Sequence, residues 1–302
     1  MKVLIAEYAG SRDSILALEG KAMMSVLQES FERLGHTVFL PGSGDFNAEI
    51  AHLAPQCDYG LVIAPDDLLA GFTHTLELVT HNIGSDSTSV AVCANKRLTS
   101  KILSGAGINV PQEVTFDYTG KCVIKPIKGV GSIGVRIAKG GTVPKKNEMM
   151  VEFLEGEHYS VSIVGSRVVG EVCGFYSGLP PVFLTINRQH VMIGENGVFT
   201  YHGGETPVHP EREDEIIEVA KKTIELLGCQ GYVGIDIIVG KKIWVVDVNP
   251  RPTMSIVGVV GVIEEEIADI LLKATVGIPP KNVHYNGRKA MFDEFGEVTF
   301  FS

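Results

Sequence analysis

The sequence is poor in the features of proteins that bind nucleic acids or cross membranes. Its 36 Asp and Glu residues outnumber its 26 Lys and Arg residues, and the formal net charge of −10 argues against a nucleic-acid-binding surface. No uninterrupted apolar run is long enough to span a bilayer. Met1–Ala6 is followed at once by Glu7, which predicts a first strand rather than a signal peptide. We therefore expect no nucleic-acid partner and no membrane association.

Cysteine is also scarce. The chain has 5 cysteines and no C-x-x-C pair, and an odd number suits reduced thiols. They are Cys57, Cys93, Cys122, Cys173 and Cys229. This usage predicts a cytoplasmic protein.

Two widespread nucleotide-binding motifs are missing. Each Gly-Lys pair (Gly20-Lys21, Gly120-Lys121 and Gly240-Lys241) lacks the following Ser or Thr, which excludes a P-loop. Protein kinases place their lysine after the glycine-rich loop and need His-Arg-Asp and Asp-Phe-Gly elements, and the chain has neither element. Any nucleotide site must therefore be of another kind.

The first ~90 residues predict a parallel sheet, since strand-like and helical patterns alternate along them. At 302 residues the chain exceeds one typical domain, so we expect two or three units. Ligands of parallel sheets bind beyond the carboxyl ends of the strands. The residues predicted at these ends are Glu7, Tyr8, Asp66 and Asp67. They are candidates for substrate contacts, although ordinary turn residues occupy the same positions.

A glycine-rich loop marks a second unit. Gly129-x-Gly131-x-x-Gly134 spells the dinucleotide-binding fingerprint, which requires a strand before it and a helix after it. A strand, Cys122–Pro126, does precede it, but the segment that follows alternates as a strand and ends at Gly140-Gly141. A hairpin flap over nucleotide phosphates fits better than the loop of an NAD-dependent dehydrogenase, because glycines let backbone N–H groups approach the oxygens.

A cluster of oxygen ligands is predicted in the third unit. Two apolar, strand-like runs flank Gly240-Lys241-Lys242, which indicates a hairpin. Asp247 and Asn249 point the same way on the second run, and the hairpin can bring Asp236 beside them. Two carboxylates and an amide suit Mg²⁺ on nucleotide phosphates. The alternative is that Asp247 and Asn249 simply end a strand.

Taken in order, these features resemble the ATP-grasp superfamily of carboxylate–amine ligases over residues 90–260. The resemblance implies an α/β and α+β protein, in which an N-terminal parallel αβα domain precedes two lobes that hold ATP. We expect these units at residues 1–90, 91–154 and 155–302. The sequence order that carries the resemblance is Lys96, Lys125, the glycine flap, the Glu152 strand, Asp236, Asp247 and Asn249.

The resemblance also implies roles for residues. Lys96 and Lys125 would bind phosphates, Lys125 and Arg251 would assist catalysis, and Arg251 would stabilise an acyl phosphate. The flap would consist of Gly129, Gly131, Ser132 and Gly134. The adenine slot would be lined by Glu152, Phe153 and Leu154. Two Mg²⁺ ions, replaceable by Mn²⁺, would be held by Asp236, Asp247 and Asn249.

The chain departs from related ligases in two places. A glutamate that takes the ribose hydroxyls in D-alanine–D-alanine ligases has no clear match, so either Glu157 or His158 would serve. Those relatives also carry an arginine two residues before the first metal aspartate, where this chain has Gly234. The transition-state charge would then fall to Arg251 and the lysines.

Four short segments resemble tyramine–glutamate ligases of methanofuran biosynthesis more narrowly. They are Glu7-Tyr8-Ala9, Glu19–Met23, Asn187-Arg188-Gln189 and Tyr201–Pro207. The resemblance implies an ADP-forming ligase for glutamate and tyramine. A ligase for another amino acid or a peptide-like substrate is the alternative, as is a non-catalytic nucleotide-binding regulator on the same fold.

The substrates would be small carboxylates and amines. Arg188 can bind an α-carboxylate through a bidentate pair, unless it is an exposed loop charge. Glu7 and Tyr8 are further candidates, and Tyr8, Phe175 and Tyr176 could line an apolar slot for tyramine. We expect the polar segment Asn187–Gly204 to act as a lid, and the apolar segment Ile256–Ile263 to form either core or a homodimer interface.

Overall fold

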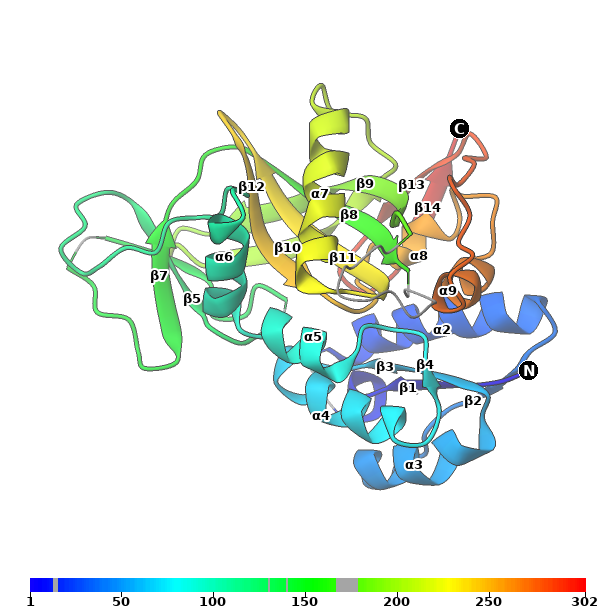
Figure 1. The fold of residues 1–302 in the computed structure, drawn as a ribbon. Helices are drawn as coiled ribbons and strands as arrows, with labels where there is room; N and C mark the ends of the chain where they lie inside the picture. The colour runs from blue at the N-terminus through cyan, green and yellow to red at the C-terminus, as the bar shows by residue number, and fades with distance from the viewer. Residues whose placement is uncertain (13–15, 130, 140, 167–178) are drawn as a thin grey trace.

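The computed structural model describes residues 1–12, 16–129, 131–139, 141–166 and 179–302. Three β-sheets organise these residues. In Figure 1 the N-terminal sheet lies at the lower right, the smallest sheet at the left and the largest sheet across the centre. The N-terminal parallel sheet and the two later antiparallel sheets confirm the predicted α/β and α+β fold.

The first sheet has four parallel strands in the order β2-β1-β3-β4. Its strands are β1 (Lys2–Glu7), β2 (Thr37–Phe39), β3 (Tyr59–Ile63) and β4 (His81–Asn82). The helices around it are α1 (Ala9–Arg12), α2 (Ala17–Arg33), α3 (Phe46–Leu53), the 3-10 turn η1 (Ala54–Gln56), α4 (Asp66–Glu77) and α5 (Ser87–Cys93). Because β1 and β3 are neighbours and parallel, their carboxyl ends place Glu7 and Asp66 at the same edge of the sheet.

The second sheet is antiparallel and carries the glycine-rich loop. Helix α6 (Lys96–Gly105) precedes it, and its strands are β5 (Cys122–Pro126), β6 (Arg136–Ala138) and β7 (Glu148–Glu152). The loop joins β5 to β6, which pair antiparallel, with Cys122 opposite Ala138. The predicted hairpin is therefore confirmed, and the dinucleotide-binding alternative is wrong because no helix follows the loop.

The third sheet has seven antiparallel strands in the order β12-β11-β8-β9-β10-β13-β14. The strands are β8 (Glu157–Gly165), β9 (Val182–Ile193), β10 (Phe199–Thr206), β11 (Gly231–Val239), β12 (Ile243–Asn249), β13 (Lys289–Phe292) and β14 (Val298–Phe301). Its helices are α7 (Glu213–Leu227), α8 (Ile256–Val259) and α9 (Ile267–Thr275). The segment Asn187–Gly204, expected to act as a lid, falls within β9 and β10 and the turn between them, and these two strands pair antiparallel in this sheet.

One hydrophobic core joins the first sheet to the third. Leu27 and Phe31 of α2 belong to the same buried cluster as Ile256 of α8 and Leu271 of α9. The segment Ile256–Ile263 contributes to this cluster, since Ile256, Val259, Val262 and Ile263 are buried within the chain. The N-terminal sheet is thereby held firmly against the large sheet, which fixes the edge that carries Glu7 and Asp66.

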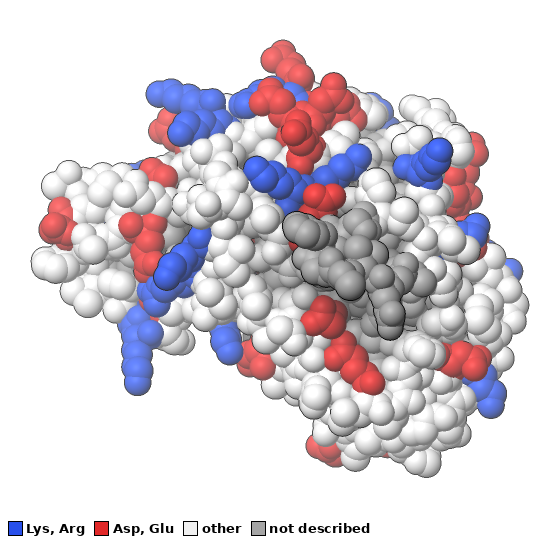
Figure 2. Space-filling model, in the orientation of Figure 1, with Lys and Arg blue, Asp and Glu red and all other residues white. Residues whose placement is uncertain are grey.

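Charged side chains of both signs are interspersed over the face shown in Figure 2. The acidic side chains over the start of α7 gather at its top, where Arg212 pairs with Glu215 at 2.7 Å and His209 with Glu213 at 3.0 Å. These pairs and the positive end of the helix account for the acidic cluster. Among the described residues, no helix combines the length and the apolar character that crossing a membrane demands.

Candidate active site

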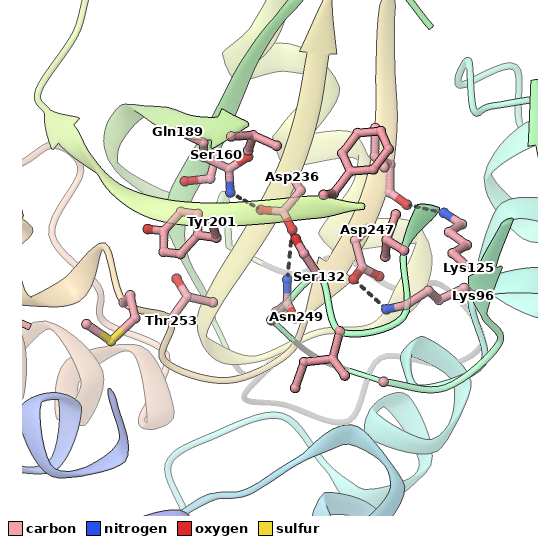
Figure 3. A pocket seen from close by; sticks show the side chains of 18 of the residues that line it. Lys96, Lys125, Ser132, Ser160, Gln189, Tyr201, Asp236, Asp247, Asn249 and Thr253 are labelled. Carbon is pink, nitrogen blue, oxygen red and sulfur yellow. Dashed lines mark hydrogen bonds and ion pairs between the residues drawn. The ribbon is translucent and has the colours of Figure 1, made fainter. Parts of the chain in front are cut away.

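A cavity of about 270 Å³ lies where the three sheets meet. All three contribute to its wall, through Glu7 from the first sheet, Lys125 from the second and Asp236 from the third. Further lining residues, labelled in Figure 3, are Lys96, Ser132, Ser160, Gln189, Tyr201, Asp247, Asn249 and Thr253. Most of the predicted site residues therefore share one space, although they are spread over some 250 positions of the sequence.

The predicted oxygen ligands converge on β11 and β12. Asp236 lies opposite Asp247 in this antiparallel pair, and a register irregularity follows Asp236. Asn249 Nδ2 donates to Asp236 Oδ2 at 3.4 Å, and Gln189 Nε2 of β9 donates to Asp236 Oδ1 at 2.9 Å (Figure 3). Asp236, Asp247 and Asn249 thus lie together, as the sequence predicts.

This group suits a divalent cation that also binds phosphates. Burial, together with the nearby carboxylate of Asp247, raises the pKa of Asp236 to about 7. A cation between the two carboxylates would relieve that electrostatic cost. Within the described ranges no group of three or more His, Cys, Asp and Glu residues is placed to hold a metal ion by itself. Two carboxylates and an amide are nevertheless enough for Mg²⁺, which keeps water and phosphate oxygens among its ligands.

Lys96 is the first residue of α6 and is 8% exposed. Its ammonium donates to Asp247 Oδ2 and lies 3.6 Å from Asp66 Oδ2 (Figure 3 shows the first contact). Burial acts to lower the pKa of Lys96, but Asp247 and Asp66 outweigh it, so the pKa is raised. Lys96 therefore keeps its positive charge in the cavity.

Lys125 is buried on β5, and its Nζ donates to the carbonyl oxygen of Val246 at 3.1 Å. Burial lowers the pKa of Lys125 to about 8. The side chain crosses from the small sheet to β12 of the large sheet, so its ammonium reaches the space between the two lobes (Figure 3). A phosphate in that space would hold the lysine in its charged form.

Arg251 completes a set of three cations at this end of the cavity. Its Nη2 lies 3.5 Å from Asp66 Oδ1 and donates to Asn249 Oδ1 at 3.3 Å. Its Nη1 donates to the carbonyl oxygen of Pro252 at 3.2 Å. Its buried Nε has no hydrogen-bond partner among the residues that the structure describes. Within the part of the chain that the structure describes, the guanidinium thus keeps one buried N–H group unpaired beside the carboxylate cluster.

The glycine flap has a conformation that glycines permit. Gly131 (φ 63°) and Gly134 (φ 78°) have positive φ angles, and Ser132 adopts the same region at 59°. Gly129, Gly131 and Ser132 line the cavity, whereas Gly134 lies beside Pro126 at the base of the turn. The flap therefore presents backbone and the Ser132 side chain to the cavity, as expected for a phosphate cover.

The predicted adenine slot lies at the end of β7. Glu152, Phe153 and Leu154 all line the cavity. Phe153 is held by its N–H, which donates to the carbonyl oxygen of Lys121 at 3.0 Å, and by the Lys121 ammonium 3.6 Å from its ring centroid. These contacts fix an apolar wall beside Lys125.

The structure separates the two candidates for the ribose. His158 lines the cavity, and burial lowers its pKa. Side chains alternate along β8, so Glu157 lies on the opposite face, where it accepts from the Tyr159 hydroxyl at 2.7 Å. Of the two candidates, His158 therefore faces the cavity and Glu157 does not.

The predicted substrate residues are only partly brought together. Glu7 lines the cavity, and its carboxylate accepts from the N–H groups of Ala9 and Gly10, both at 2.7 Å. Tyr8 instead packs against two rings of the N-terminal unit, Phe46 and Phe72, at centroid distances of 5.3 and 5.5 Å. Its side chain is directed away from the cavity because it alternates with Glu7.

Arg188 is likewise outside the cavity wall. It lies on the same face of the sheet as Glu157, near Glu205 at 3.3 Å and Glu157 at 3.7 Å, and is 45% exposed. The structure thus does not bring Arg188 to the carboxylate-binding position predicted for it. Phe175 and Tyr176 lie outside the described residues.

Three residues at or behind the cavity were not identified as nucleotide or metal residues from the sequence. Gln189 binds Asp236, Tyr201 lines the cavity beside it, and Asp66 contacts both Lys96 and Arg251 from outside the wall. Asp66 carried one signal, its position after a buried strand. Gln189 belongs to one of the segments that carry the narrower resemblance, but its contact with Asp236 depends on the pairing of β9 with β8.

Comparison with known proteins agrees with this geometry. The profile of the ATP-grasp domain matches residues 93–255. The chain is 30% identical to the tyramine–L-glutamate ligase of Methanocaldococcus fervens, over 90% of this chain and 93% of that protein. It is 28% identical to the enzyme of the same name from Methanocaldococcus jannaschii, over 90% of this chain and 88% of that protein.

A solved structure gives the same result at the level of the fold. An ATP-grasp superfamily protein from Archaeoglobus fulgidus superposes with a TM-score of 0.75 at 27% identity, covering 96% of this chain and 92% of the other. The cation set, the hairpin flap and the paired carboxylates also line a single cavity. The chain therefore belongs to the ATP-grasp family of ATP-dependent carboxylate–amine ligases.

Proposed function

We propose that this ATP-grasp ligase joins L-glutamate to tyramine, with release of ADP and phosphate. The observation that carries the substrate assignment is the similarity to two tyramine–L-glutamate ligases along 90% of the chain. Members of the family use ATP and divalent metal ions in general. We assign two Mg²⁺ ions, which Mn²⁺ can replace, to Asp236, Asp247 and Asn249.

The nucleotide binds at the cationic end of the cavity. When bound, ATP supplies the phosphoryl group that activates the carboxylate, and the divalent ions neutralise charge that develops on it. Lys96 and Lys125 bind phosphate oxygens as charged donors. His158 and the segment Glu152–Leu154 hold the nucleoside, and the backbone of the flap covers the phosphates.

Arg251 serves the step after activation. Its guanidinium lies between the metal-binding group and Asp66, and Arg251 lines the cavity that would hold the transferred phosphoryl group. A fixed cation at this position stabilises the charge that develops when the amine attacks and phosphate departs. The flap and the walls of the cavity keep out water, which would hydrolyse the activated carboxylate.

The wall of the cavity also holds groups that suit an aromatic amine. It includes the apolar or aromatic side chains of Leu16, Met23 and Phe199 and the carboxylates of Glu7 and Glu19. Such a set is complementary to a ring that carries an ammonium group. The same cavity therefore offers cations for ATP and carboxylates for tyramine.

The test is ADP release with Mg-ATP, L-glutamate and a panel of amines that includes tyramine, with mass detection of the product. The proposal predicts glutamyl-tyramine in a one-to-one ratio with ADP. Amide formed with a different acid or amine would keep the ligase and reject the substrates. ATP binding without turnover across a broad panel would instead identify a nucleotide-binding regulator.

A further inference from the structure

Asp66 connects the N-terminal sheet to the cations of the active site. It is the first residue of α4, directly after β3, and is 6% exposed. Its two carboxylate oxygens face different partners, with Oδ2 3.6 Å from Lys96 Nζ and Oδ1 3.5 Å from Arg251 Nη2. Lys96 and Arg251 line the cavity, whereas Asp66 lies outside its wall. Asp66 can therefore act on a ligand only through these two cations.

Electrostatics favours the arrangement in which the carboxylate of Asp66 lies between the charged groups of Lys96 and Arg251. Lys96 is 8% exposed and the Arg251 side chain 11% exposed, so each needs a nearby anion to offset the cost of its burial. Lys96 has Asp247 as a second partner, but Asp66 is the one carboxylate in contact with Arg251 within the described part of the chain. Loss of Asp66 would therefore affect the orientation of Arg251 most.

We propose that Asp66 is a positioning residue, whose carboxylate directs Arg251 and Lys96 toward the phosphoryl group that is transferred. The inference rests on the phosphate-binding roles proposed above for these two cations. The N-terminal sheet would then affect the reaction, because Asp66 follows β3 and its fixed position determines where Lys96 and Arg251 place their charges. The alternative is that Asp66 only interacts with the positive end of the α4 dipole, a role that would apply equally to Asp67, the next residue of the helix.

Asp67 provides a matched control. It lies in the same helical turn and carries the same charge. It is exposed outside the cavity wall, so the structure does not bring it to the substrate-contact position considered for it from the sequence. We expect Asp66→Asn to lower kcat by about 10- to 100-fold, the loss typical of a catalytic group displaced by roughly 1 Å. The KM for ATP should change less than about threefold, since the phosphate-binding charges remain. Asp67→Asn should leave both constants within about twofold of the unmodified protein.

Two further measurements separate positioning from general damage. The Kd of Mg-ATP for Asp66→Asn should be unchanged or lower, because Lys96 and Arg251 lose a competing anion, whereas a distorted site would bind ATP more weakly. In a double-mutant cycle, Asp66→Asn and Arg251→Lys should lower kcat together by clearly less than the product of their separate effects.

The inference is overturned by a kcat of Asp66→Asn close to that of Asp67→Asn, by a multiplicative cycle, or by weakened ATP binding. The proposed function fails separately, through the absence of glutamyl-tyramine in the unmodified protein. In that case weaker ATP binding by Asp66→Asn would still overturn the inference, since this measurement needs no turnover.

Discussion

Gln189 Nε2 of β9 donates a hydrogen bond of 2.9 Å to Asp236 Oδ1 of β11 in the large sheet. Asn249 Nδ2 approaches the second oxygen of Asp236 at 3.4 Å. The carboxylate is thus oriented from both sides before any ligand binds. If Asp236 binds a metal ion as proposed, an outer partner such as Gln189 fixes the direction of its carboxylate, and loss of such a partner typically costs about 10- to 100-fold in metal affinity.

The carboxylate cluster makes a direct prediction for catalysis. Asp247→Asn or Asn249→Ala should lower ADP formation at least about 100-fold, because each removes an oxygen ligand or a charge from the site of the metal ions. Initial rates across a range of Mg²⁺ concentrations measure the effect. Asp214→Asn, on the exposed first turn of α7, is the matched control for the loss of one negative charge. Near-normal rates in either site variant would reject the metal assignment.

Lys125 should make ATP binding depend on pH. Its pKa is lowered to about 8 by burial, so the free protein loses this positive charge as the pH rises through that value. ATP affinity should accordingly fall above pH 8 in the unmodified protein. Lys125→Ala should bind ATP at least about tenfold more weakly at pH 7 and lose that part of the pH dependence.

Isothermal titration at pH 7 and pH 9 measures both effects on ATP affinity. Lys128→Ala removes an exposed lysine of the same hairpin and should change neither. An unchanged affinity in Lys125→Ala would place the phosphates away from β5.

The alternation of side chains along β8 predicts which residue meets the nucleoside. His158→Ala should raise the KM for ATP several-fold, since it removes a wall of the cavity. Glu157→Ala should leave that KM unchanged, because Glu157 interacts with Tyr159 and Arg188 on the other face. Steady-state kinetics on both variants decide the matter, and the reverse order of effects would require a different position for the ribose.

The ion pair between Arg136 and Glu148 in the small sheet should make the stability of the protein depend on pH. Hydrogen bonds from Arg136, at 2.8 and 3.0 Å, and from the N–H of Lys145 lower the pKa of Glu148 from 4.5 to about 2. A carboxyl group whose pKa is lowered by folding contributes its full stabilisation at pH values above its pKa in the unfolded chain. This contribution is lost as the pH falls toward the pKa of the group in the folded protein. The pair should therefore contribute at neutral pH and little near pH 2.

Glu148→Gln should lower the free energy of unfolding by about 1–2 kcal/mol at pH 7, after allowance for solvent around Arg136. Denaturant unfolding at pH 7 and pH 3 measures the loss, which should shrink at the lower pH. Glu155→Gln, an exposed change nearby, is the control. An equal loss at both pH values would mean that packing, rather than charge, is responsible.

The features set by local sequence could be predicted. The hairpin flap followed from glycines and strand alternation, and the placement of Asp247 beside Asn249 followed from the period of a strand. Asp236 joined them because a short turn dictates which strands pair. In each case the information lies within a few neighbouring residues.

The features set by long-range strand pairing could not be predicted from the sequence. The polar segment Asn187–Gly204 does not predict strands, because inner side chains of β9 and β10, such as Gln189 and Tyr201, face the cavity rather than an apolar core. The usual apolar alternation of a strand is lost there. Without the strand, neither the outward direction of Arg188 nor the contact of Gln189 with Asp236 could be derived.

The most direct test of the account follows the oxygen atoms of the acid. Glutamate labelled with ¹⁸O in its carboxylates is incubated with Mg-ATP and tyramine, and the phosphate and the nucleotide product are analysed by mass spectrometry. Activation as an acyl phosphate predicts one ¹⁸O atom in each phosphate released, with ADP as the unlabelled nucleotide product. Label in AMP, or amide formation with unlabelled phosphate, would contradict phosphoryl transfer to the carboxylate at this site.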